Sequence, residues 1–316
     1  MSMKAYWEID VTAEPTRAEP SVRRGWATVP RDVRPATINR YDHYAQIAQG
    51  AAQTGFDGLF IRHRHDGDDS QIVAAVIARE TPGLALIPEF PASVGSAVYA
   101  AKQAVSFQRL AHGRLGWAIA PDASAGERAA AADAIDDADL AARTAEFLTV
   151  ARGVHGGAGF DFAGRFFEVK GGGFTAPLDR AAFPPVFLGG SGEEAWQLSA
   201  EHADVHLFDP APLSDLRHAI EAIDGLAKRA GRSVSFGIRQ PLHARERAED
   251  VGPTAQAAIA GDYETVAGRL AELAGVGIDH FILGASPSFE EAYRIGQFVL
   301  PRFRALARPA AARAAA

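Results

Sequence analysis

The sequence predicts an α/β fold in which eight parallel strands and eight helices alternate to form one (β/α)8 barrel of the TIM type. Short apolar runs alternate with segments of helical apolar spacing over almost the whole chain, which is typical of a parallel sheet covered by helices. The eight repeats favour a closed barrel. The alternative is an open Rossmann-like sheet, which is disfavoured because no G-x-G-x-x-G sequence follows the first strand.

The expected barrel strands are short and mostly apolar, and they are Lys4–Asp10, Gly58–Ile61, Leu84–Phe90, Arg114–Ala120, Val186–Gly189, Asp204–Phe208, Val234–Arg239 and His280–Leu283. The expected helices are Tyr41–Thr54, Asp68–Glu80, Ala97–Leu110, Leu140–Val154, Glu193–Glu201, Ser214–Ala230, Tyr263–Ala274 and Glu290–Leu300. Asp68, Asp69 and Ser70 are candidate N-caps, and Gly55 is a candidate C-cap.

Three segments fall outside this alternation. Thr12–Pro35 is rich in Pro and Arg and is expected to be a long loop of the kind that forms lids or binding segments. Asp161–Val169 is expected to form a small inserted hairpin. We expect one barrel domain over residues 1–305, followed by a disordered Ala-rich tail at 306–316.

Composition excludes several classes of protein. The 316 residues carry a formal net charge of -7, so no basic excess is present to bind nucleic acid. The absence of cysteine rules out disulfides, thiolate metal sites and a cysteine nucleophile. No signal peptide or membrane-spanning run of about 18 apolar residues is visible, so we expect a cytoplasmic enzyme without membrane contacts.

The clearest candidate binding motif is the glycine-rich turn Gly189-Gly190-Ser191-Gly192, which joins a strand directly to a helix. Glycines allow a ligand to approach the backbone, and free N–H groups at a helix start attract an anion. The alternative is a tight turn in which Ser191 is only an N-cap. Its position after a late barrel strand favours a phosphate site.

Arg239 ends the seventh expected strand and is a candidate ligand for an oxyanion at the barrel mouth. The alternative is an ion pair with a rim acid such as Glu89 or Asp209. His243 follows in the same segment as a candidate acid or base, although a solvated loop histidine is the more common case.

His63 and His65 follow the second strand in the polar segment IRHRHDGDD, as further candidates for proton transfer. Their spacing also raises a metal site, but the ligand set is too dispersed, so no metal is expected. Phe90 and Trp117 lie near strand ends and could line a pocket for a planar ring, or pack in the core. Since no nucleophile motif is present, a cofactor is expected to carry the chemistry.

Several co-linear blocks resemble the luciferase-like flavin-dependent monooxygenases, and most of all their alkanesulfonate monooxygenase branch. The resemblance runs from about Tyr41 to Pro301, and its blocks are YAQIAQGAAQTGFDGLFI, AAKQAVSFQRLAHGRLGWAI, FEVKGGGFTAPLDRAAFPPVFLGGSGEEAWQLSAEHADVHLF, GRSVSFGIR and GDYETVAGRLAELAGVGIDHFILGASPSFEEAYRIGQFVLPRF.

The resemblance implies a TIM-type barrel that uses reduced FMN, supplied by a separate NAD(P)H:FMN reductase, to oxygenate a small organosulfur compound. The family's phosphate-binding turn matches Gly189, Gly190 and Ser191, with Gly192 next, and its active-site arginine matches Arg239. It also implies a homodimer or a higher homo-oligomer.

The sequence departs from that branch at several active-site positions. Its cysteine falls at Gly67, its histidine at Pro241 (two residues before His243), and its two tyrosines at Ala141 and Ser286. The late insertion that carries a second arginine is shortened between Glu246 and Gly261. These departures indicate a substrate other than a simple alkanesulfonate.

The resulting hypothesis is an FMNH2-dependent two-component monooxygenase that acts on a small anionic organosulfur or related compound. Arg239 would bind the anionic group or stabilise charge on oxygen, and His63, His65 or His243 would transfer protons. One alternative is an F420-dependent oxidoreductase on the same fold. Another is a flavin-binding barrel without catalytic activity.

Overall fold

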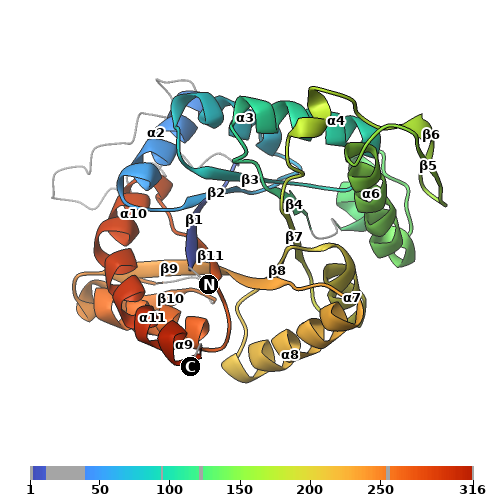
Figure 1. Ribbon diagram of the computed structural model, residues 1–316. Helices are drawn as coiled ribbons and strands as arrows, with labels where there is room; N and C mark the ends of the chain where they lie inside the picture. The colour runs from blue at the N-terminus through green and yellow to red at the C-terminus, as the bar shows by residue number, and fades with distance from the viewer. Residues whose placement is uncertain (1–2, 12–39, 94, 121–123, 254–256, 315–316) are drawn as a thin grey trace.

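A computed structural model describes residues 3–11, 40–93, 95–120, 124–253 and 257–314 (Figure 1). The expected Thr12–Pro35 loop lies outside these residues. The described chain contains the expected eight barrel strands, all parallel: β1 (Lys4–Ile9), β2 (Gly58–Ile61), β3 (Ala85–Phe90), β4 (Trp117–Ile119), β7 (Val186–Gly189), β8 (Val205–Phe208), β9 (Ser235–Arg245) and β11 (His280–Gly284). They follow the order β9-β11-β1-β2-β3-β4-β7-β8, and β8 pairs with β9, so the barrel closes.

The helices surround the barrel, as the view along its axis in Figure 1 shows. They are α2 (Arg40–Gln53), α3 (Ser70–Glu80), α4 (Ala97–Leu110), α6 (Leu140–His155), α7 (Glu193–His202), α8 (Leu213–Arg229), α9 (Tyr263–Gly275) and α10 (Ser288–Arg294). The capping prediction is confirmed for α3, where the Asp69 carboxylate accepts hydrogen bonds from the backbone N–H groups of Gln71 and Ile72. The predicted hairpin is formed by the antiparallel strands β5 (Phe160–Ala163) and β6 (Glu168–Gly172).

Three elements differ from the sequence-based expectation. The polar segment before α6 contains a short helix, α5 (Ala125–Ala130), which begins with a capping box between Ser124 and Glu127. The last helix does not end near residue 300. A π-helical turn (Ile295–Val299) leads into α11 (Leu300–Ala314), which contains most of the segment expected to be a disordered tail. The helix thus continues into the expected tail, and a boundary between the barrel domain and a tail at residue 306 stays a prediction.

Strand β9 is the third difference, because it continues six residues past its expected end at Arg239. Its extension lies beyond the barrel wall and pairs in parallel with β10 (Ile259–Asp262), in the register Leu242 with Ile259 and Arg245 with Asp262. The shortened late insertion connects these two strands. The local pattern did not reveal this pairing, because β10 is only four residues long and the stability of a strand depends on its partner.

Two apolar layers hold the barrel together, one on each face of its wall. Inward-facing side chains fill the interior, and they are Tyr6, Phe60, Ile87, Ala118, Phe187, Val205, Leu207 and Ile282. The larger outer layer packs the other strand faces against the helices and includes Trp7, Phe90 and Trp117. Since strand side chains alternate between faces, Ile87 and Glu89 point inward while Phe90 points outward.

Two histidines are held neutral inside the fold by burial. The His280 ring stacks on Tyr6 and its Nδ1 lies 3.0 Å from the Tyr6 hydroxyl, at the amino end of the barrel. His206 lies between β8 and α7, with Nδ1 2.7 Å from the Ser199 hydroxyl. Desolvation by burial lowers the pKa of each imidazole to about 4.

Acidification from pH 7 to pH 5 is expected to destabilise the protein through these histidines. The unfolded chain takes up protons at its ordinary histidine pKa of about 6.5, whereas the folded state does not, so each group removes about 2 kcal/mol from the unfolding free energy. Urea denaturation at both pH values measures the loss. In His280→Gln the loss is expected to be about 2 kcal/mol smaller. An unchanged loss would contradict this assignment.

Candidate active site at the barrel mouth

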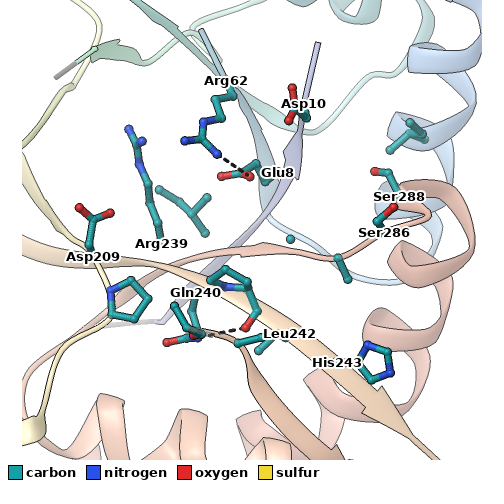
Figure 2. Close-up of a pocket in the computed structure, with 18 of the residues that line it drawn as sticks. Glu8, Asp10, Arg62, Asp209, Arg239, Gln240, Leu242, His243, Ser286 and Ser288 are labelled. Carbon is teal, nitrogen blue, oxygen red and sulfur yellow. Dashed lines mark hydrogen bonds and ion pairs between the residues drawn. The ribbon is translucent and has the colours of Figure 1, made fainter. Parts of the chain in front are cut away.

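A cavity of about 590 Å³ opens at the carboxyl-terminal ends of the barrel strands. Its walls come from the ends of β1, β2, β8, β9 and β11 and from one face of α2 (Figure 2). Its charged side chains are Glu8, Asp10, Arg40, Arg62, Asp209 and Arg239. Apolar side chains such as Ile47, Leu242 and Ile282 complete the lining. In this fold class, catalytic residues come from these strand ends.

Arg239 projects from β9 into the mouth but is not a free guanidinium. Its Nη2 donates a hydrogen bond to Oε1 of Glu89, which stands at the end of β3 and is only 3% exposed. The guanidinium carbon of Arg239 also lies 4.7 Å from the centre of the Phe60 ring. The ion pair with a rim acid, one of the two interpretations open from the sequence, is therefore present.

Glu89 has a second hydrogen bond, from the β2 side of the mouth. Its Oε2 accepts from the backbone N–H of His63 at 3.0 Å. Burial lowers the pKa of the His63 imidazole, with Glu89 opposing the shift, so His63 is mostly neutral at pH 7. The Glu89 carboxylate thus joins the backbone of His63 to the side chain of Arg239, although these residues are far apart in sequence.

Glu8 is the second carboxylate that enters the mouth, from the end of β1. Its Oε1 lies 3.9 Å from Nη1 of Arg62, a much looser contact than the one Glu89 makes (Figure 2). Burial raises the pKa of the Glu8 carboxyl, and the nearby charges of Arg62 and Arg239 only partly oppose this. A carboxyl in this position can hold or release a proton inside the cavity.

Tyr44 and Arg40 reach the cavity from α2. The Tyr44 hydroxyl lies 2.9 Å from Oδ2 of Asp68 and 3.0 Å from the carbonyl oxygen of Val11, so it is tied to the loop ends around the mouth. Nη1 of Arg40 lies 3.7 Å from the same Asp68 oxygen. Asp68, proposed from the sequence as a cap, instead orients these two side chains.

The other two candidate histidines occupy separate places. His243 lies on the β9 extension and lines the far end of the cavity, well apart from Arg239 and Arg62 in Figure 2. Burial and the neighbouring Arg245 lower its pKa, so it is neutral at pH 7. His65 is exposed and does not line the cavity. The described residues contain no group of side chains suited to a metal ion.

The turn at Gly189–Gly192 lies on the same rim as the cavity, at the carboxyl end of β7, but does not line it. Gly190 (φ +124°) and Gly192 (φ +92°) have backbone conformations that other residues rarely adopt. Gly190, Ser191 and Gly192 are exposed, and no side chain caps the start of α7. The backbone N–H groups there are thus accessible to an anion.

The expectation that Phe90 and Trp117 line a cofactor pocket is not met. Phe90 is 2% exposed and Trp117 is 1% exposed, and their rings pack edge-on, 5.2 Å apart. Both rings also contact Phe147 of α6, on the outer side of the barrel wall. Both therefore stabilise the packing of the helices onto the barrel and do not face the mouth.

Sequence reasoning missed Glu8 and Arg62 as site residues and considered Glu89 only as a partner of Arg239. One signal was available: Glu8 and Glu89 are lone carboxylates near the ends of otherwise apolar strands. Charged residues seldom occupy buried strand positions without a specific role.

The model of the luciferase-like monooxygenase family matches residues 22–280, which is most of the chain. The chain belongs to the luciferase-like monooxygenase family. This places it among enzymes, as expected, while the alkanesulfonate branch is not specifically supported. Among the described residues, no helix is long and apolar enough to cross a membrane.

Several solved structures share the fold. A riboflavin lyase, solved with modified FMN and riboflavin, superposes with a TM-score of 0.78 at 16% identity over 96% of this chain and 92% of its own. EDTA monooxygenase from Chelativorans sp. BNC1 gives 0.76 at 16%, over 96% and 94%. Coenzyme F420-dependent tetrahydromethanopterin reductase from Methanopyrus kandleri gives 0.76 at 16%, over 96% and 100%. At such identities the likeness shows a common fold.

The proton affinity of Glu8 can be measured directly. We expect one glutamate side chain to titrate above the ordinary carboxyl range in 13C NMR spectra of protein labelled at the glutamate carboxyl carbon, because burial disfavours its charged form. Glu8→Gln should remove this signal. Glu249→Gln, at an exposed surface position, serves as the control and should leave it in place. A Glu8 that titrates normally would contradict the assignment.

Proposed function

We propose that the protein is an FMNH2-dependent monooxygenase that receives reduced FMN from a separate NAD(P)H:FMN reductase. Its substrate would be a small organosulfur compound or a related organic molecule bound in the cavity at the mouth. Membership of the luciferase-like monooxygenase family supports the reaction class. The observation that carries a cofactor with a phosphate group is the accessible Gly189–Gly192 turn at the carboxyl end of β7.

The turn fits a phosphate group. The exposed backbone between Gly190 and Gly192 and the Ser191 hydroxyl offer hydrogen-bond donors, and the uncapped start of α7 adds its dipole. No Lys or Arg occurs between Val186 and His202, and Glu193 and Glu194 stand in the first turn of α7. Binding there would therefore depend on backbone N–H groups and Ser191, which makes the turn's geometry decisive.

The side chains at the mouth would then act on what lies in the cavity. Reduced FMN, when bound, supplies the electrons that activate dioxygen. Arg239, fixed by Glu89, and Arg62 would offer hydrogen-bond donors to an oxygen that gains negative charge. Glu8, with its raised pKa, can donate a proton into the cavity, whereas His63 does not line it. Apolar walls restrict water.

Anaerobic titration with FMNH2 tests the proposal. Gly192→Ala is expected to weaken binding at least about tenfold, or about 1.4 kcal/mol, because a Cβ strains a φ of +92° and shifts the donors of the turn. Gly83→Ala is the matched control: Gly83 has a φ of +100° and equally open space around a Cβ, but lies in the turn before β3. Equal affinities in the two variants would contradict a phosphate site at this turn.

F420-dependent oxidoreduction is the second candidate function. It is favoured by the likeness to the F420-dependent reductase, whose chain is covered over its full length. The two candidates differ in their need for oxygen. An oxygenase is expected to consume dioxygen with FMNH2 and no F420, beyond the oxygen that free FMNH2 consumes by itself. Binding of F420 without binding of FMNH2 would support the second candidate instead.

A further inference from the structure

We infer that Glu89 determines substrate specificity: it occupies the Arg239 guanidinium as an internal counter-anion and so reserves the cavity for uncharged organic substrates. This inference rests on the proposed function, because it assigns the substrate class of the same site. It replaces the anionic substrate expected from the sequence with an uncharged one.

The geometry of Glu89 carries the first step. Its two oxygens are both engaged, Oε1 by Nη2 of Arg239 and Oε2 by the backbone N–H of His63 at 3.0 Å. The side chain is 3% exposed and that of Arg239 is 15% exposed, so water screens the pair little. A sulfonate or carboxylate that displaced Glu89 from Arg239 would leave the buried Glu89 carboxylate without its counter-ion, which is strongly unfavourable.

The other cations around the cavity are also paired. Arg62 lies 3.9 Å from Glu8, and Arg40 lies 3.7 Å from Asp68. The two carboxylates that hold Arg239 and Arg40 stand behind the lining, and three more line the cavity: Glu8, Asp10 and Asp209. Each of the three guanidinium groups in the described part of the mouth thus already has a carboxylate beside it.

This pairing opposes an anionic ligand. A ligand anion would have to compete at each described guanidinium with the carboxylate already beside it. Burial lowers the pKa of His243, so this side chain adds no positive charge near pH 7.5. The apolar walls at Ile47, Leu242 and Ile282 suit an uncharged organic molecule instead.

A matched pair of ligands tests the inference. Octane-1-sulfonate and octane-1-sulfonamide have the same chain and a head group of similar size, but only the sulfonate is charged near pH 7.5. Isothermal titration of the full chain without cofactor measures both affinities. Wild-type protein is expected to bind the sulfonamide at least about tenfold more tightly than the sulfonate.

Glu89→Gln is the decisive variant. Glutamine retains an acceptor for His63 but removes the charge, so Arg239 becomes available to an anion. Sulfonate affinity is expected to rise at least about tenfold, with sulfonamide affinity little changed. The double variant Glu89→Gln/Arg239→Gln should lose this gain in sulfonate affinity. A merely structural role of Glu89 would not make the gain depend on Arg239. Melting temperatures and circular dichroism verify folding.

Several outcomes would overturn the inference. Wild-type protein that binds the sulfonate as tightly as the sulfonamide contradicts it, as does a folded Glu89→Gln variant without a gain for the sulfonate. Failure of wild type to bind either ligand, with no gain in the variant, counts against it as well. If Glu89→Gln does not fold, Glu8→Gln frees Arg62 and is expected to give a smaller gain; no gain there contradicts the inference.

The same proteins separate this inference from the proposed function. Wild-type protein that fails to bind FMNH2 contradicts the proposed function, whatever the two ligands do. Protein that binds FMNH2 normally, but shows no sulfonate gain in Glu89→Gln, contradicts only the role of Glu89.

Discussion

The hydrogen-bonded pairing of β8 with β9 is the interaction on which the rest of the structure depends. It closes the sheet, so that eight parallel strands end on one common rim. Closure also brings the inward-facing end of β3 within reach of β9, and Glu89 meets Arg239 across 150 positions of sequence. In an open sheet, three strands would separate β9 from β3 and keep these charges apart. The chemistry of the mouth is thus a consequence of topology more than of any local motif.

Much of this topology could be predicted from the sequence, because each βα repeat has its own apolar period. The site could be predicted less well, and Phe90 and Glu89 show why. They are neighbours at one strand end, and a shift of one position decides which of them faces the mouth and which packs under α6. Composition favoured the aromatic residue as a pocket wall, whereas the pleat gives that place to the carboxylate.

The functional identity of the site was predicted at the level of the family, and its finer chemistry was not. Arg239 was correctly placed at the mouth. His243 reaches the cavity, but on a strand extension whose short partner strand β10 was not predicted. Because an ion pair depends on distances, no sequence pattern could decide whether Arg239 faces a ligand or Glu89. The structure shows the contact with Glu89, and our inference of an uncharged substrate rests on that contact.

The β9–β10 ladder has a consequence for how this enzyme can diversify. Its parallel register fixes both ends of the connection that begins after Arg245 and ends before Ile259. One side of the cavity is therefore anchored by sheet hydrogen bonds, while the chain that joins the two anchors can gain or lose residues without disturbing the barrel. Added length in this connection would cost the barrel little stability, because the entropy of closing a loop grows slowly with its length.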